Sequence, residues 1–187
     1  MKRSARKLHI PVLTALFAAM TAVLTLFLKI PVLTGYIHPG DAVIFLASCL
    51  LPAPAAMLCG ALGGTLADIL GGYTLYVIPT LIIKSLIALP FNSRDKKIIT
   101  KRNLIALIFS ALITVTGYYL ADAFIIAYSQ SASAADFGKI ILTAVPWTSA
   151  LYGLAGNLVQ AAAGSAVFAA VGTALDKINV KKLLEEK

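Results

Sequence analysis

The ionisable side chains of this 187-residue chain that could do chemistry stand within strongly apolar sequence. His38 and Asp41 belong to the run GYIHPGD at residues 35–41, Asp68 closes a glycine-rich segment, and Lys84 lies in the next apolar segment. Ionisable groups are costly inside a bilayer, so they face a cavity or one another and usually serve a function. These residues therefore predict a polar pocket inside a membrane protein.

Other polar and aromatic residues gather in the same way within later apolar segments. Asp122 follows two tyrosines, and Asn157 and Gln160 follow a tryptophan and a tyrosine. Aromatic residues form belts at membrane interfaces, but carboxylates, amides and a lysine at a similar depth favour a pocket for a small, polar, partly planar molecule. The candidate binding residues are Tyr36, His38, Asp68, Tyr73, Tyr76, Lys84, Asp122, Trp147, Asn157 and Gln160.

Asp68 and Lys84 are expected to form an ion pair. Their segments are joined by the short Gly71-Gly72-Tyr73 connection, which predicts antiparallel neighbouring helices. A lysine side chain can extend toward a carboxylate at another depth, and an unpaired ammonium there would be unfavourable. Such a pair either fixes helix packing or lines a cavity and contacts a ligand.

The other two ionisable residues each have a structural alternative. Asp41 follows Gly40 at the start of an apolar segment, which is typical of a helix N-cap, and a substrate contact is the second interpretation. His38 either anchors a loop by hydrogen bonds or binds a metal ion. No second ligand lies at metal-site spacing, so we expect no metal.

The sequence contains no enzyme signature. Glycine-rich phosphate loops, His-Glu metal motifs and nucleophiles near a base are all missing. Cys49 and Cys59 lie inside apolar segments and are expected to be small buried hydrophobic residues. The chain is therefore predicted to be neither an enzyme nor dependent on a cofactor.

Composition places the chain in the membrane. Hydrophobic residues make up 59% of it and charged residues 13%, and the mean hydropathy is +0.89. These values indicate an all-α integral membrane protein forming a single domain over residues 1–187. Because the first apolar segment is long enough to span, it is interpreted as a retained helix and not a cleaved signal peptide. The six predicted spans cover about residues 11–29, 41–51, 55–70, 76–89, 103–128 and 147–175.

The basic residues predict the topology. Thirteen of the 16 Lys and Arg residues fall into three clusters, at residues 2–7, 94–102 and 177–187. Six spans place all three clusters on one side, and the positive-inside rule makes that side cytoplasmic, with both termini. Clusters flanking apolar spans argue against a nucleic-acid partner and favour contact with a lipid bilayer.

The first apolar segment carries closely spaced small residues. Ala15 and Ala19 form one four-residue pair, and Ala18 and Ala22 form another on an adjacent face. Small residues at this spacing let a second helix approach closely in lipid. The partner is either another helix of this chain or a separate membrane subunit.

The motifs in this order resemble the S components of energy-coupling factor (ECF) transporters. The run at residues 35–41, the segment ADILGGY at residues 67–73 and IIKSL at residues 82–86 carry the resemblance. It implies a six-helix subunit of a bacterial plasma membrane that binds a water-soluble vitamin or related micronutrient from outside. It also implies docking through the alanines of the first helix on a membrane T component with two ATPase subunits. The first outer loop would be a gate, with Tyr36 and His38, and the whole subunit would topple to deliver substrate.

The resemblance leaves the substrate open. Lys84 would favour an anion such as pantothenate if it faced the pocket unpaired, whereas Asp68 and Asp122 would favour a cationic or hydrogen-bond-donating ring. The main rival function is a self-contained oligomeric channel or secondary transporter. A lipid-modifying membrane enzyme would need a nucleophile or metal cluster, and a scaffold would leave the buried charges unexplained.

Overall fold

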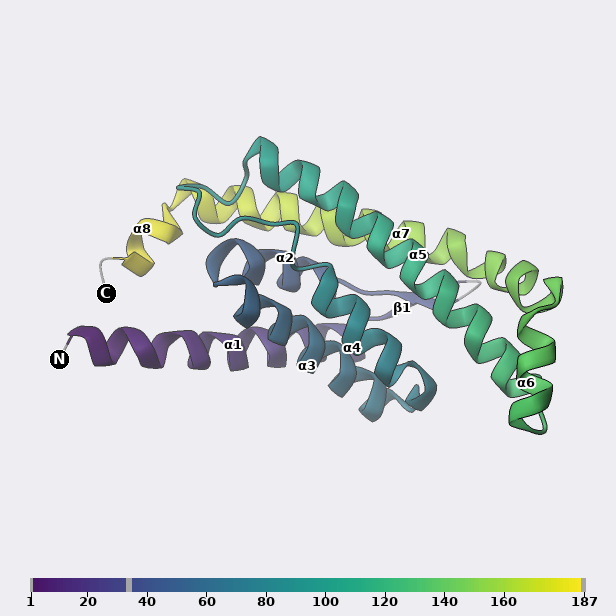
Figure 1. The fold of residues 1–187 in the computed structure, drawn as a ribbon. Helices are drawn as coiled ribbons and strands as arrows, with labels where there is room; N and C mark the ends of the chain where they lie inside the picture. The colour runs from purple at the N-terminus through teal and green to yellow at the C-terminus, as the bar shows by residue number, and fades with distance from the viewer. Residues whose placement is uncertain (1, 33–34, 186–187) are drawn as a thin grey trace.

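A computed structural model describes residues 2–32 and 35–185, with side chains described for residues 9–30 and 37–184. The chain is almost entirely helical, with one short hairpin (Figure 1). The elements are α1 (Lys2–Phe27), β1 (Ile30–Val32), β2 (Gly35–Ile37), α2 (Gly40–Leu50), α3 (Ala53–Gly71), η1 (Thr74–Tyr76), α4 (Val77–Leu86), α5 (Lys101–Gln130), α6 (Ala134–Ile141), α7 (Ala144–Lys177) and α8 (Val180–Glu185).

Four of these helices are long and apolar enough to cross a membrane. They are α1 from His9 onward, α3, α5 and α7, and two shorter apolar helices accompany them, α2 and the η1–α4 segment. Eleven residues rise only about 16 Å, roughly half of a hydrocarbon core about 30 Å thick. Ten of the eleven residues of α2 are buried, so this helix lies inside the bundle.

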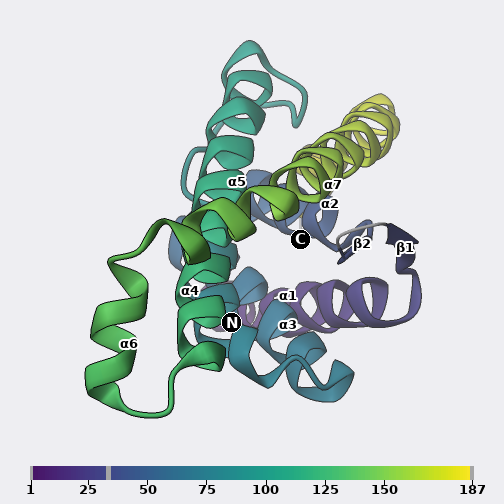
Figure 2. The same cartoon turned by 90° about the vertical axis from the view of Figure 1, so that its right-hand side faces the viewer.

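The helices form two groups around α2. One group contains α1, α3 and α4, with α1 packed along α3, and the other contains the long helices α5 and α7 (Figures 1 and 2). The rings of Phe45, Phe91 and Phe168 meet between the groups at centroid distances of 5.0 to 6.0 Å. Aromatic contacts of this kind make the central α2 a shared wall of both groups.

Glycines on α3 let its neighbours approach closely. A Cβ at Gly60 would lie 2.2 Å from the backbone oxygen of Lys84, and one at Gly64 would lie 2.8 Å from the Thr80 side chain. A Cβ at Gly63 would lie 2.6 Å from the backbone oxygen of Ala18 on α1. Helix α3 therefore presents separate glycine faces to α4 and α1, as small residues do in membrane bundles.

Two connections between the long helices contain regular secondary structure. The loop between α1 and α2 contains the antiparallel hairpin β1–β2, in which Ile30 pairs with Ile37. The polar connector after α5 contains the helix α6, whose N-cap Ser133 accepts a hydrogen bond from the backbone N–H of Asp136 at 3.1 Å. A hydroxyl cap of this type satisfies an otherwise unpaired amide and starts the helix.

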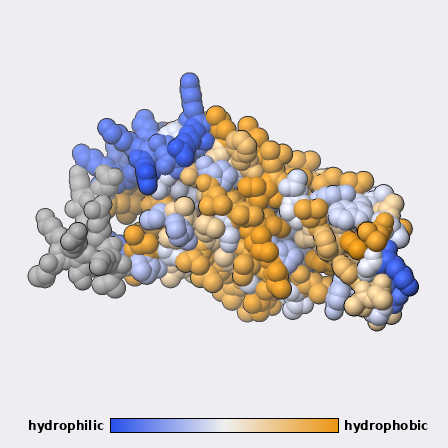
Figure 3. Space-filling model, viewed as in Figure 1, coloured by the Kyte–Doolittle hydropathy of each residue, from blue (hydrophilic) through white to orange (hydrophobic). Residues whose placement is uncertain are grey.

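Hydrophilic surface is concentrated at the ends of the molecule. Figure 3 shows a broad apolar band between hydrophilic ends. The start of α1 and the helix α8 lie at one end (Figure 1). The charged loop before α5 is held to the end of α7, because Asp176 accepts hydrogen bonds from the backbone N–H groups of Ile98 and Ile99 at 2.7 and 2.9 Å. This arrangement suits a molecule whose middle lies in lipid.

Candidate functional site

A polar cavity of about 220 Å³ lies between α3, α4, α5 and α7. It is bordered by the residue that follows the β1–β2 hairpin, His38. Its lining consists of His38, Asp68, Tyr73, Tyr76, Thr80, Lys84, Tyr118, Asp122, Gly153, Gly156, Asn157 and Gln160. A cavity with this many polar groups is unusual in an otherwise apolar bundle, so it is the candidate site.

Helical periodicity explains which side chains reach the cavity. Tyr76, Thr80 and Lys84 lie four residues apart along η1–α4, and Tyr118 and Asp122 lie four apart on α5. Residues at this spacing share one face of a helix. On α7, Gly153 and Gly156 each have a second lining residue four positions further on, at Asn157 and Gln160.

The structure brings together eight of the ten candidate residues. They are His38, Asp68, Tyr73, Tyr76, Lys84, Asp122, Asn157 and Gln160. The side chain of Tyr36 lies outside the described residues, although its backbone belongs to β2. Four lining residues were not predicted, namely Thr80, Tyr118, Gly153 and Gly156. The four-residue spacing from the predicted positions could have identified all four.

Trp147 does not line the cavity, contrary to the prediction. Its ring packs on Tyr119 and Phe124 at centroid distances of 6.0 and 6.2 Å, and its Nε1 donates to the backbone oxygen of Ile141 at 2.8 Å. On an ideal helix it lies about 130° around α7 from the cavity-lining face. Trp147 therefore anchors α6 to α7 and α5.

Lys84 pairs with Asp41 and not with Asp68, so the predicted partner is wrong. Its Nζ lies 2.5 Å from Asp41 Oδ1, and both side chains are buried. The other oxygen, Asp41 Oδ2, accepts a hydrogen bond from Gln160 Nε2 at 3.0 Å. The glycines of α3 explain why Lys84 pairs with Asp41. Because Gly60 and Gly64 carry no side chains, α4 packs close to α3, and the Lys84 ammonium can then reach the start of α2.

Asp41 is also not the N-cap of α2. The capping position is Pro39, and the first backbone N–H of the helix, that of Gly40, donates to His38 Nδ1 and not to Asp41. Because α2 is buried, the carboxylate of Asp41 sits in the bundle interior, where the Lys84 ammonium compensates its charge. Leaving a buried carboxylate without a compensating charge costs more free energy than leaving a helix end without a side-chain cap.

His38 is fixed by hydrogen bonds on its backbone and its ring. Gln160 accepts from the His38 N–H at 2.8 Å and donates to the His38 carbonyl at 3.0 Å. The backbone N–H of Gly40 donates to Nδ1 at 3.2 Å, so Nδ1 is an acceptor and Thr25 Oγ1, also at 3.2 Å, donates to it. Burial lowers the pKa of His38 to about 4, so the ring is neutral at pH 7, with its proton on Nε2.

Two carboxylates face the cavity without a lysine partner. Asp68 is 5% exposed, and within the described part of the chain its Oδ2 is a buried side-chain oxygen with no hydrogen-bond partner. Asp122 Oδ1 accepts a hydrogen bond from the Tyr76 hydroxyl at 2.7 Å. A Cβ at Gly153 would lie 2.6 Å from Asp122 Oδ2, so only glycine leaves room for that carboxylate.

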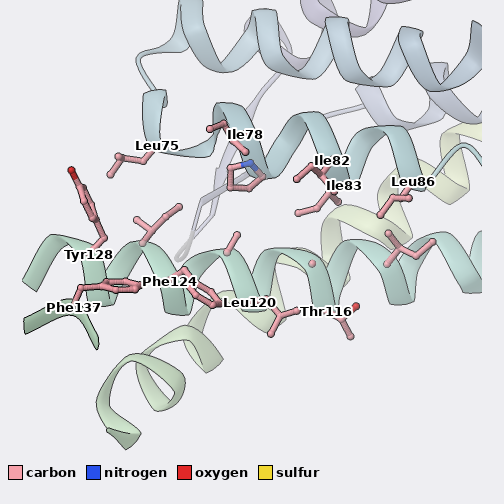
Figure 4. Close-up of a pocket in the computed structure, with 15 residues that line it drawn as sticks. Leu75, Ile78, Ile82, Ile83, Leu86, Thr116, Leu120, Phe124, Tyr128 and Phe137 are labelled. Carbon is pink, nitrogen blue, oxygen red and sulfur yellow. The ribbon is translucent and has the colours of Figure 1, made fainter. Parts of the chain in front are cut away.

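A second hollow lies across the contact between α4 and α5 from the polar cavity. This groove has a volume of about 780 Å³ and is lined almost wholly by apolar side chains of η1, α4, α5 and α6 (Figure 4). Two of its lining residues, Ile78 and Tyr128, are 71% and 62% exposed. It offers no charged group to a ligand, so it is not the candidate site.

The alanines of α1 divide into a buried pair and an exposed pair. Ala18 and Ala22 are 8% and 5% exposed, and Ala18 packs beside Gly63 of α3. Ala15 and Ala19 lie on the exposed face of the helix. The predicted partner surface is therefore restricted to Ala15 and Ala19, because the other pair is used within the chain.

No group of three or more His, Cys, Asp or Glu side chains that could hold a metal ion occurs among the described residues. Cys49 and Cys59 are buried, and neither lines the cavity. The functional groups of the cavity are therefore hydroxyl, amide, carboxylate, imidazole and ammonium. Such groups bind and orient a ligand by hydrogen bonds and charge.

A model of the ECF-type riboflavin transporter S component family matches residues 6–177. The match covers all of the helices from α2 to α7 and most of α1. The chain belongs to this family. No curated protein matches it significantly.

Family membership confirms the predicted S component and its role in vitamin transport across a membrane. The family is one of transporter subunits and not of enzymes. With four helices long enough to span and two shorter apolar ones, the chain is a multi-pass membrane protein. Within such a subunit the polar cavity is the place where a substrate can be held.

Proposed function

We propose that this S component binds a water-soluble vitamin or related micronutrient in the cavity between α3, α4, α5 and α7. The observation that carries the proposal is the gathering of charged, amide and phenolic groups around one cavity in an apolar helix bundle. In lipid, such groups are retained for function. The eight candidate residues described above would contact the substrate, with His38 at the gate.

The S component docks on a T component with two ATPases in a bacterial plasma membrane, and topples to deliver its substrate. Both termini are cytoplasmic, and α2 and η1–α4 complete a six-helix single domain with the four long helices. The exposed pair Ala15 and Ala19 supports docking along α1, since large apolar side chains flank it on the same surface, including Leu16 and Met20. Small residues between large ones allow close helix contact in lipid.

Native mass spectrometry of the detergent-purified chain tests the binding role. After incubation with a vitamin panel that includes riboflavin, one vitamin should be retained at a one-to-one ratio. A folded protein that retains nothing would contradict the proposal. Solute flux through liposomes containing this chain alone would instead support a channel or secondary transporter.

Ala19→Trp tests docking separately from binding. The indole should block co-purification with a coexpressed T component while leaving vitamin affinity within about twofold, because Ala19 lies outside the cavity. Leu151→Trp on the exposed face of α7 is the matched control and should leave both properties unchanged. Equal loss of assembly and binding in Ala19→Trp would contradict the separation of the two surfaces.

A further inference from the structure

The side chains that line the cavity carry a net negative charge. Three side chains on its lining are charged in their ordinary forms, namely Asp68, Lys84 and Asp122. Lys84 is already paired at 2.5 Å with Asp41, which does not line the cavity. Because the charges of Lys84 and Asp41 cancel, the carboxylates of Asp68 and Asp122 remain uncompensated. His38 adds no charge, since it is neutral at pH 7.

Of the two carboxylates, Asp68 has the greater need of a hydrogen-bond partner from a ligand. Its side chain is at least nine-tenths buried, and its Oδ2 lies at the cavity with no hydrogen-bond partner in the described chain. A buried polar atom without a partner is unfavourable, and more so when the group is charged. A ligand that donates a hydrogen bond to this oxygen, or brings positive charge near it, would remove that penalty.

Asp122 supplies a second acceptor whose position is set by its neighbours. The Tyr76 hydroxyl donates to Oδ1, and the bare backbone at Gly153 leaves space beside Oδ2. The carboxylate is thus oriented by one oxygen while the other faces the cavity wall at α7. Both carboxylates therefore accept hydrogen bonds, and neither can donate one when ionised.

The aromatic lining also suits positive charge. Tyr73, Tyr76 and Tyr118 line the cavity, and the Lys84 ammonium lies 5.5 Å from the centre of the Tyr118 ring. The ammonium of Lys29, a residue outside the cavity lining, lies 5.6 Å from the centre of the Tyr73 ring. The faces of tyrosine rings attract cations within about 6 Å, and aromatic cages use this to bind ligands with positively charged nitrogen.

We propose that the substrate of this cavity carries a positively charged nitrogen group, which binds between the carboxylates of Asp68 and Asp122 and against the tyrosine rings. This inference rests on the proposed function and adds the chemical class of the substrate. An anionic substrate is disfavoured, because Lys84 is neutralised by Asp41 and the remaining charges would repel it. Like charges in such a site provide selectivity against the wrong ligand.

A panel sorted by charge tests the proposal on the full-length chain in detergent. The cationic set contains thiamine, choline and pyridoxamine, the uncharged set riboflavin and nicotinamide, and the anionic set pantothenate and folate. Binding of each compound is measured by native mass spectrometry and isothermal titration calorimetry at pH 7. The tightest binder should be cationic and should bind at least tenfold more tightly than any member of the other sets.

The outcomes separate the two proposals. A tightest binder from the uncharged or anionic set would overturn the charge class and leave the vitamin-binding role intact. No binding from any set, with folded protein verified by its melting transition, would overturn the binding role and the charge class together.

Variants provide a second test on whichever cation binds. Asp68→Asn keeps the shape of the side chain but removes its charge, and it should lower the affinity for the cation at least tenfold. Asp136→Asn on α6, a carboxylate outside the cavity, is the matched control and should leave affinity unchanged. Unchanged affinity in Asp68→Asn at an unchanged melting temperature would overturn the assigned contact. If Asp68→Asn does not fold, Asp122→Asn takes its place. A tenfold loss of affinity for the cation would then support the proposal, and unchanged affinity at an unchanged melting temperature would overturn it.

Discussion

The two hollows on either side of the α4–α5 contact differ in size and in chemistry. The outer groove has about 780 Å³ and is apolar, whereas the inner cavity has about 220 Å³ and is lined by charged, amide and phenolic groups. In a bilayer an apolar surface groove meets lipid chains, which are as apolar as its own side chains. The smaller hollow is the unusual one, so chemistry and not volume identifies the site.

One pair of helices builds both hollows. On α4, Ile82 and Ile83 face the groove while the adjacent Lys84 lines the cavity. The two helices pack closely here, because a Cβ at Gly117 of α5 would lie 2.8 Å from Ile83 Cγ1. Helical periodicity thus separates a lipid-facing surface from a polar interior over a single residue step.

The largest expected effect comes from breaking the Lys84–Asp41 ion pair beside the polar cavity. Lys84→Met leaves Asp41 as an uncompensated buried carboxylate, and it should lower the free energy of unfolding by about 3–5 kcal/mol. Thermal unfolding in detergent measures the change. Combining it with Asp41→Asn removes the unpaired charge and should restore part of the stability. No difference between the single and the double variant would contradict the pairing.

The next effect comes from the close approach of α3 and α4 that permits this pairing. Gly60→Ala places a methyl group against the Lys84 backbone, and overpacking of this kind destabilises by about 1–3 kcal/mol. Gly138→Ala on α6 is the control, because nothing lies within 4 Å of its added Cβ. The melting temperature should fall in the first variant and hold or rise in the second. Equal behaviour of the two would argue against a tight α3–α4 contact.

A smaller effect concerns the neutral imidazole of His38, which lines the cavity. The pKa of His38 is about 4 in the folded chain and ordinarily 6.5, so the folded state binds fewer protons between these values. The stability from the neutral ring is therefore complete above pH 6.5 and is lost as the pH falls toward 4, by on the order of 1–2 kcal/mol between pH 7 and 5. Burial is the main cause, with Asp41 opposing it and Lys84 adding to it.

The melting temperature of the wild type should fall more steeply from pH 7 to 5 than that of His38→Gln. The variant keeps a hydrogen-bonding side chain but has no group that titrates in this range. Parallel curves for the two proteins would show that His38 does not contribute.

The smallest effects compare the two hollows directly. Tyr118→Phe removes the hydroxyl that lies 3.1 Å from Thr80 Oγ1 in the cavity, and it should weaken ligand binding by roughly fivefold to tenfold, the equivalent of about one hydrogen bond. Ile82→Ala truncates a half-exposed groove side chain and should change the affinity less than twofold. Titration calorimetry measures both. A larger loss in Ile82→Ala would reverse the assignment of the site.

The sequence alone determines the membrane class and most of the cavity lining. Asp68, Lys84, Asp122 and Gln160 can be identified without a structure, because polar groups inside apolar segments are costly and therefore stand out. The ordered motifs around them are enough to indicate the S component family, which the family comparison confirms. These features depend on residue type and local spacing only.

The tertiary structure decides which of these residues meet. Lys84 reaches Asp41 because Gly60 and Gly64 let α4 lie against α3, and no local pattern reveals how close two helices come. Trp147 faces away from the cavity because the rotation of α7 is set by its packing on α5. Whether Lys84 favours an anion likewise depends on a partner 43 residues away in the chain. Charge pairing and helix rotation arise from contacts between distant segments, and so they required the folded molecule.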